Sequence, residues 1–270
     1  MNGVIVVDKA KGNTSFDEIR KIRKEYTIKK VGHTGTLDPM ATGVLTILVG
    51  EATKLSDYLM NHDKEYVATL SLGEKRDTGD SEGKIIETKK VPDLSEKNVK
   101  ETLKSFEGEI SQIPPKYSAI KVNGKKLYEY ARSGEEIEIK PRKVNIFEIN
   151  LIEIKENSIT FKVHCSKGTY IRTLCEDIAE KLGTVGYMSS LRRTRVGNFT
   201  LDDVGKIISI EETLKNEPEY KLKDKELSKF MNGVKIITNL KDGLVRVYDK
   251  DKFIGVGEIK NKELKRKIVV

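Results

Sequence analysis

The chain has 270 residues, enough for one large domain or for a large and a small one. Lysine and arginine outnumber aspartate and glutamate by 50 to 42, and the resulting net charge of +8 favours a polyanionic partner only weakly. No apolar run approaches the roughly 20 residues of a membrane-spanning helix, and the two cysteines can build neither a disulfide framework nor a zinc knuckle, so we expect a soluble, cytoplasmic protein.

The spacing of apolar residues predicts the regular elements of the first half of the chain. Strands are expected at 4–7, 44–49 and 66–72. Thr14-Ser15 opens a helix, and Ser15 together with Glu18 fits a reciprocal capping box at its start. A second helix follows Pro92 and stops before Gly108.

The same reasoning continues to residue 199. Asn123-Gly124 is a tight-turn signal, and Gly134 is the expected C-cap of a short helix over 127–132. Strands are expected at 144–154, 159–165 and 192–199, with an amphipathic helix over 170–182 that Gly183 closes.

The C-terminal part has a different pattern of predicted elements. A short helix at 210–214 and a polar linker at 215–224 precede short strands at 244–248, 253–259 and 268–270, which suggest a small β-barrel. The rest of the chain has no alternation of parallel strands and helices, so we expect an α+β fold with a mixed, largely antiparallel sheet and flanking helices. The expected domains are 1–210, with an insert at about 73–112, and 211–270.

A run of glycine and threonine at 32–43 holds one carboxylate, Asp38, together with His33. Glycines allow unusual backbone conformations and the close approach of another molecule. The run is therefore a candidate site for a nucleophile or a base, although Asp-Pro and Gly-Thr are also common in ordinary turns. It is not a Walker A loop, because the Lys-Ser/Thr end is absent.

Five blocks stand out in chain order: DKAKGNTS at 8–15, GHTGTLDPMATGVL at 32–45, KEY at 64–66, PPKYSA with GKKLY at 114–128, and SKGTYIR at 166–172. Together they resemble, in the same order, the motifs of the bacterial TruB-type tRNA pseudouridine synthases. In the first block Ala10 stands where the family usually has proline. GLVRVY at 243–248 and FIGVGE at 253–258 resemble, less specifically, the small C-terminal PUA-like RNA-binding barrel of that family.

The resemblance implies a pseudouridine synthase-like catalytic domain and assigns roles to individual residues. Asp38 would be the nucleophile, attacking either the sugar C1′ or the base C6, and Arg172 would keep its carboxylate ionised. Tyr66 would stack on the uracil, with its phenol a candidate to move the C5 proton. By sequence alone Tyr66 is more readily interpreted as a core aromatic, and the periodicity does not decide between this role of Arg172 and a surface helix residue.

The resemblance also implies how RNA is held. His33 would fill the space that the flipped base leaves, unless it is only a loop imidazole bonded to its own backbone. Tyr170 and Leu191 would pack beside the pocket. Candidate phosphate contacts are Lys9, Lys11, Lys116, Lys125, Lys126, Arg192 and Arg193.

The implied reaction is the isomerisation of uridine 55 in the T loop of tRNA, by a protein that we expect to be monomeric. Because this isomerisation involves no redox change, we expect no cofactor and no metal. The three histidines also lack the spacings of metal ligands. We expect no guide RNA, although an RNA-guided synthase and a non-catalytic tRNA-binding and folding protein remain alternatives.

Overall fold

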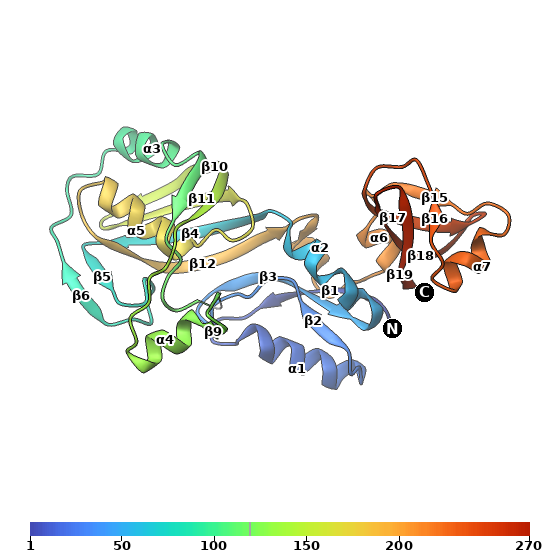
Figure 1. Ribbon diagram of the computed structural model, residues 1–270. Helices are drawn as coiled ribbons and strands as arrows, with labels where there is room; N and C mark the ends of the chain where they lie inside the picture. Colours follow the sequence, from blue (N-terminus) through green and yellow to red (C-terminus); the bar gives the residue numbers. More distant parts are fainter. Residues whose placement is uncertain (119) are drawn as a thin grey trace.

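The computed structural model describes residues 1–118 and 120–270 and has a large lobe and a small C-terminal lobe (Figure 1). The strands of the large lobe are β1 (Gly3–Lys9), β2 (Val31–His33), β3 (Thr42–Val49), β4 (Lys64–Leu72), β5 (Glu74–Arg76), β6 (Ile85–Thr88), β7 (Gly108–Gln112), β8 (Lys121–Val122), β9 (Lys125–Lys126), β10 (Arg142–Lys155), β11 (Ser158–Cys165), β12 (Gly186–Val196), β13 (Phe199–Thr200) and β14 (Ile207–Ile208). Those of the small lobe are β15 (Glu219–Lys221), β16 (Ile236–Ile237), β17 (Gly243–Asp249), β18 (Lys252–Lys260) and β19 (Glu263–Val269).

The helices lie between these strands. They are α1 (Ser15–Tyr26), α2 (Ser56–Met60), α3 (Glu96–Lys104), α4 (Leu127–Ser133), α5 (Ile171–Lys181), α6 (Ile210–Thr213) and α7 (Glu226–Met231), with 3-10 helices at Gly50–Leu55 and Leu201–Asp203. In the part of the chain described, no helix is both long enough and apolar enough to cross a membrane.

One extended sheet organises the large lobe. Among the described residues it has ten strands, in the order β14-β1-β3-β12-β4-β11-β10-β7, with β2 beside β3 and β13 beside β12. Its pairs are antiparallel except where β12 meets β3, at Arg192 opposite Thr42 and Arg193 opposite Gly43. The expected α+β, largely antiparallel architecture is therefore confirmed, and the strand β7, which ends the 73–112 segment, forms one edge of the sheet.

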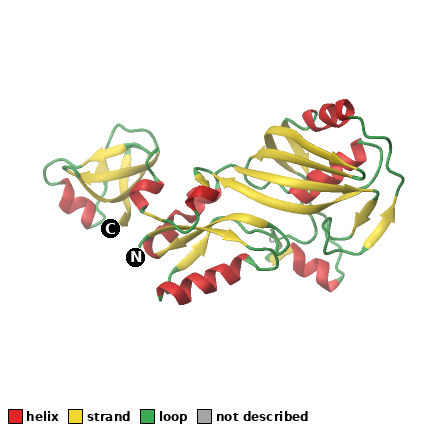
Figure 2. Cartoon of the chain, turned by 180° about the vertical axis from the view of Figure 1, so that it is seen from behind, coloured by secondary structure: helices red, strands yellow, loops and turns green. Residues whose placement is uncertain are grey.

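Two cores lie on opposite faces of the strands β1 and β3. On one face Leu45 and Ile47 pack with residues of α1, α3 and α5, which cover that side of the sheet (Figure 2). On the other face Val44 and Leu48 pack with Leu244 and other residues of the small lobe. Successive side chains of β3 point to opposite faces of the sheet, and those on the second face join the small lobe to the large one in a shared apolar core.

The small lobe is the expected small barrel in the form of a curled sheet. Within the described residues it has five strands, in the order β15-β17-β18-β19-β16. The polar stretch 215–224 was expected to be only a linker, and that expectation is wrong. Its residues Glu219–Lys221 form β15, which runs parallel to β17 and bonds to it, with Tyr220 packed into the apolar core of the small lobe. A strand of three residues is too short to show an alternating pattern in the sequence.

The start of α1 also differs from the prediction. The N-cap is Thr14, whose side chain forms a reciprocal capping box with Asp17, one residue earlier than the expected pair of Ser15 and Glu18. Ser15 is 2% exposed and instead accepts a hydrogen bond from the backbone N–H of Leu37, at 2.9 Å. The residue that resembled a helix cap therefore holds the loop that carries Asp38.

Candidate active site

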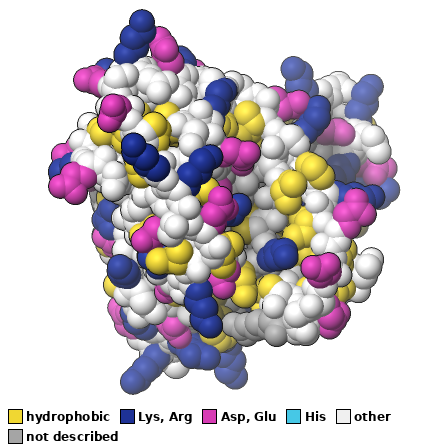
Figure 3. Space-filling view, turned by 90° about the vertical axis from the view of Figure 1, so that its left-hand side faces the viewer, with side chains coloured by type: hydrophobic (Ala, Val, Ile, Leu, Met, Phe, Trp, Pro, Cys, Tyr) yellow, Lys and Arg dark blue, Asp and Glu magenta, His cyan; other side chains and the backbone are white. Residues whose placement is uncertain are grey.

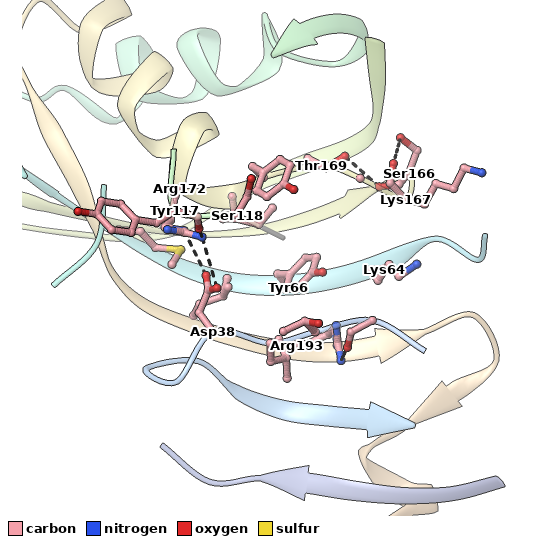
Figure 4. Close-up of a pocket in the computed structure, with 18 of the residues that line it drawn as sticks. Asp38, Lys64, Tyr66, Tyr117, Ser118, Ser166, Lys167, Thr169, Arg172 and Arg193 are labelled. Atoms are coloured by element: carbon pink, nitrogen blue, oxygen red, sulfur yellow. Dashed lines mark hydrogen bonds and ion pairs between the residues drawn. The ribbon is translucent and has the colours of Figure 1, made fainter. Parts of the chain in front are cut away.

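A cavity of about 480 Å³ opens between the loop at 35–38, the strands β4 and β12, the start of α5 and the segment around Tyr117 (Figure 4). Its lining combines charged side chains with aromatic and aliphatic ones. The lining residues include Thr36, Leu37, Asp38, Met60, Lys64, Tyr66, Tyr117, Ser118, Tyr128, Lys167, Tyr170, Ile171, Arg172, Met188, Leu191 and Arg193. The structure thus brings Asp38, Tyr66, Arg172, Tyr170 and Leu191, which lie far apart in the sequence, around one space.

The loop before β3 is held from below by the opening motif of the chain. The ammonium group of Lys9 donates to the carbonyls of Asn13 at 2.6 Å and of Ala10 and Pro39 at 3.1 Å. The backbone N–H of Gly12 donates to the same Pro39 carbonyl, at 2.8 Å. These bonds hold the loop on the Pro39 side of Asp38, and the bond between Ser15 and the Leu37 N–H holds it on the other side.

The phosphate role expected of Lys9 does not agree with this geometry. Lys9 is 0% exposed, and burial lowers its pKa, with the carboxylates of Glu18 and Asp38 acting in the opposite direction. A lysine that binds three backbone carbonyls inside the protein cannot reach a phosphate on the surface. Lys9 is a positioning residue of the loop.

Asp38 and Arg172 form an ion pair at the cavity (Figure 4). Arg172 Nε lies 3.1 Å from Asp38 Oδ2, and Arg172 Nη2 donates to Asp38 Oδ1 at 3.3 Å. This two-pronged contact is the geometry that a guanidinium makes best with a carboxylate. The side chain of Arg172 is 7% exposed and that of Asp38 is 34% exposed, so the carboxylate keeps an open side toward the cavity.

A second carboxylate, Asp80, lies behind Arg172. Asp80 Oδ2 is 3.7 Å from Arg172 Nη1, and its side chain is 6% exposed. The guanidinium also donates to the carbonyls of Thr78, at 3.2 Å, and of Tyr117, at 3.0 Å. Sequence analysis missed Asp80, whose only signal was an acidic loop at 77–83; its contact spans more than ninety positions along the chain.

These charges have opposing effects on Asp38. Burial raises the pKa of Asp38 above its ordinary value, the Arg172 guanidinium lowers it, and the nearby Asp80 carboxylate raises it again. Because burial outweighs the ion pair, the carboxylate is less well stabilised than one in water. A poorly solvated carboxylate with a free face is a stronger nucleophile than a fully hydrated one.

Gln112 orients the start of α5. Its side-chain amide accepts from the Tyr170 N–H at 3.0 Å and donates to the Tyr170 carbonyl at 3.3 Å. Gln112 is 2% exposed, at the end of the edge strand β7. The helix turn that presents Arg172 is therefore tied to the far edge of the sheet, a connection that no local pattern indicated.

Tyr66 forms one wall of the cavity from near the start of β4 (Figure 4). It is 8% exposed, and burial raises the pKa of its phenol. The buried Leu191 and Met188 of β12 also line the cavity. A flat ring beside aliphatic side chains suits the face of a planar base.

His33 ends β2 and does not line the cavity among the described residues. Its Nδ1 accepts from the backbone N–H of Gly35, at 3.2 Å. Burial and the charge of Arg193 lower its pKa, so the imidazole is neutral at physiological pH. In this structure the ring makes the local backbone contact that was the alternative to a role in base flipping.

The remaining expected phosphate contacts differ in exposure and in the groups that they contact. Lys11 and Lys116 are exposed, whereas Arg192 pairs with Asp8 at 2.7 Å and Lys125 with Glu135 at 2.7 Å. Lys126 lies over the ring of Tyr128. On the face shown in Figure 3, basic side chains are interspersed with acidic ones.

Arg193 does not belong to this surface set. It is 1% exposed and lines the cavity beside Tyr66, so the expected phosphate contact is corrected to an internal one. Within residues 1–118 and 120–270, no group of three or more His, Cys, Asp or Glu side chains is arranged to hold a metal ion.

Three family models together match residues 23–270. The model described as TruB family pseudouridylate synthase, N-terminal domain, matches 23–171. The tRNA pseudouridylate synthase B C-terminal domain matches 172–235, and the model described as Pseudouridine synthase II TruB, C-terminal, matches 218–270.

Curated relatives cover almost the whole chain. The tRNA pseudouridine synthase B of Clostridium kluyveri is 45% identical, covering 100% of this chain and 99% of its own. The proteins of the same name from Clostridium tetani and Francisella philomiragia are 46% and 42% identical, over 97% and 96% of this chain and 97% and 91% of their own.

Solved structures share the fold. A chain in a crystal structure of a Cbf5-Nop10-Gar1 complex superposes with a TM-score of 0.71 at 28% identity, over 95% of this chain and 78% of its own. A chain in an H/ACA RNP bound to a substrate RNA containing 2′-deoxyuridine gives a TM-score of 0.69 at 26% identity, over 95% of this chain and 77% of its own. The family models and the relatives together establish that this chain belongs to the TruB family of pseudouridylate synthases.

Proposed function

We propose that this protein converts uridine 55 in the T loop of tRNA to pseudouridine, alone and without a guide RNA, with Asp38 as the nucleophile. The observation that carries the proposal is the ion pair of Asp38 with Arg172. The Asp38 carboxylate faces a cavity of which Tyr66 forms one wall. The cavity volume of about 480 Å³ lies within the range of about 300–1,000 Å³ that ligand pockets usually have. It suits one nucleotide that has been turned out of its loop.

Base flipping is required because the target atoms of a stacked uridine are inaccessible. Unstacking costs a few kcal/mol, which contacts in the cavity must offset. Tyr66 offers its ring to the face of the uracil, and Leu191 packs beside it. Asp38 then attacks either C1′ or C6, and both routes end with the uracil rejoined to the sugar through C5.

The chemistry itself needs no electron acceptor. The C1′–N1 bond breaks, a C1′–C5 bond forms, the C5 proton is lost and N1 gains a proton, so product and substrate are isomers. Arg172 stabilises Asp38 both as the attacking carboxylate and as the group that leaves again. We expect the protein to act in the cytoplasm as a monomer.

Two alternatives make different predictions. A non-catalytic tRNA-folding protein has no need of a nucleophile, whereas the relatives named tRNA pseudouridine synthase B favour catalysis. An RNA-guided synthase is the second alternative, since one similar solved structure is an RNP bound to a substrate RNA, although this chain covers only 77% of the similar chain in it.

The test is to incubate the purified protein with an unmodified tRNA transcript, without guide RNA, and to map pseudouridine by sequencing. We expect one modified position, in the T loop, and the same position in an isolated T stem-loop. Asp38→Asn should abolish product, whereas Asp57→Asn, the same change at an exposed residue of α2, should not. No product from the wild-type protein would refute the stand-alone activity, and full activity of Asp38→Asn would refute the nucleophile.

A further inference from the structure

Arg193 is a buried cation without a carboxylate partner. Its guanidinium is 1% exposed, donating from Nε to the carbonyl of Val44 at 2.7 Å and from Nη2 to the carbonyl of Gly35 at 3.2 Å. No acidic side chain of the described residues forms an ion pair with it. Buried charges are normally paired, because an unpaired one loses its hydration without compensation. This position therefore requires an explanation.

The two arginines that line the cavity differ in their charged partners. Arg172 contacts two carboxylates, Asp38 and Asp80, so that cluster carries two negative charges and one positive charge. Arg193 brings a positive charge to the other side, where burial and the charge of Arg193 lower the pKa of Lys64 to about 8. The cavity is thus polarised, with the nucleophile at its negative end and Tyr66 at its positive end.

Arg193 is linked to the cavity through Tyr66. Arg193 lies directly opposite Tyr66 where β12 pairs with β4, both side chains line the cavity, and the charge of Arg193 favours negative charge on the phenol oxygen. A guanidinium has only donors, so in a hydrogen bond between the two groups the Tyr66 oxygen must be the acceptor. The hydroxyl hydrogen of Tyr66 is then directed away from Arg193, and the cavity is the space beside it.

We propose that Arg193 is a positioning residue that acts through Tyr66, holding its phenol as a hydrogen-bond donor to the uracil while that base carries negative charge. The inference rests on the proposed function and adds a role that the ion pair of Asp38 does not supply. Arg193 lies opposite Tyr66 and donates to the backbone under the loop, and in this proposal its effect on the substrate is exerted through that phenol.

The reaction needs such a donor by either route. If Asp38 attacks C1′, the C1′–N1 bond breaks and its electron pair stays on the uracil. If Asp38 adds to C6, the electron pair of the C5–C6 bond moves onto the uracil carbonyl. In both cases the base is transiently anionic, and a donor fixed in advance costs no reorganisation at that moment. The polarised cavity places that donor opposite the carboxylates.

A double-mutant cycle tests this inference with single-turnover rates on a tRNA transcript. We expect Arg193→Met to slow turnover by about tenfold to 100-fold in the wild-type background, with little change in the protein concentration that gives half-maximal rate. In the Tyr66→Phe background the same change should cost less than about threefold, because the group through which Arg193 acts is gone. Arg193→Lys should restore part of the rate.

Arg195 on the same strand is the matched control. It is partly buried and pairs with Asp63 and Glu65, both at 2.9 Å, outside the cavity. Any effect of Arg195→Met should be independent of Tyr66→Phe, so the two losses multiply. If the Arg193 loss also multiplies with that of Tyr66→Phe, Arg193 only supports the fold and the inference is wrong.

A second measurement does not depend on whether the Arg193 variants fold. In wild-type protein labelled with ¹⁵N-arginine, the side-chain signals of the buried guanidinium groups should include one that shifts on Tyr66→Phe, which removes the accepting oxygen. Unchanged arginine signals would overturn the proposed contact. A wild-type protein that makes no pseudouridine would instead refute the proposed function, while the spectra would still report on the contact.

Discussion

Removal of the guanidinium beside Asp38 should change both the rate and the pH dependence of catalysis. In Arg172→Met the carboxylate loses the contacts at 3.1 and 3.3 Å. Removing one hydrogen-bond donor that is aimed at a reacting charge typically lowers the rate by about 10²–10³. Because the Asp38 side chain keeps 34% exposure, solvent screens part of this effect, and we take the lower end, so kcat/KM should fall by about 100-fold at neutral pH.

The direction of the pH effect follows from the charges at Asp38. In the proposed mechanism only the ionised Asp38 carboxylate attacks. Burial already raises the pKa of this carboxyl group, while Arg172 is the main influence that lowers it. Without Arg172 the pKa of Asp38 rises further. The acidic limb of the pH profile, where kcat/KM falls as the pH is lowered, must therefore move to higher pH. Arg172→Lys keeps the charge but loses the two-pronged contact, and its limb should lie between those of the wild type and Arg172→Met.

The assay is the release of tritium from a tRNA transcript labelled at C5 of uridine, measured in single turnover over a pH series. Arg246→Met is the matched control, since Arg246 is partly buried and pairs with Glu219 in the small lobe, outside the cavity. That variant should keep the wild-type limb. An equal loss at every pH in Arg172→Met, or a limb that moves to lower pH, would refute the electrostatic reasoning.

Three further predictions concern other positions. Asp80→Asn should move the acidic limb to lower pH, because the Asp80 carboxylate raises the pKa of Asp38; a shift to higher pH would contradict this. Gly43→Ala should lower the melting temperature far more than Gly12→Ala, since a Cβ at Gly43 would lie 2.1 Å from a β12 carbonyl oxygen whereas nothing lies within 4 Å at Gly12; equal losses would refute the steric cause. Burial raises the pKa of Asp177 from 3.8 to about 6, so the ionised carboxylate lowers the stability of the fold increasingly as the pH rises from 3.8 through 6. In denaturant titrations Asp177→Asn should therefore raise the free energy of unfolding by about 1 kcal/mol, after solvent screening, above pH 6 and should not change it below pH 3.8. A gain of the same size at both extremes of pH would contradict that cause.

Local patterns in the sequence were sufficient for most of the regular structure. The alternation of buried and half-buried residues along β4 and the apolar stripe of α5 depend only on the period of the backbone. The helix α4 ends at Gly134, as predicted, because its left-handed backbone at φ +70° favours glycine. By contrast, the cap of α1 was misassigned, since Thr14 and Ser15 are equally good caps by residue type.

The sequence by itself determined that a glycine-supported loop carries one carboxylate, and by resemblance which arginine and tyrosine accompany it. Only the tertiary structure decided the electrostatics of that carboxylate. Whether a lysine or arginine is a surface charge or a buried one depends on chain segments far away, as in the contact of Arg193 with the carbonyl of Val44. Burial changes both the pKa and the available partners of such a group, and no local period records it. The burial and the contacts of Lys9, Arg193 and Asp80 therefore became visible only in the folded chain.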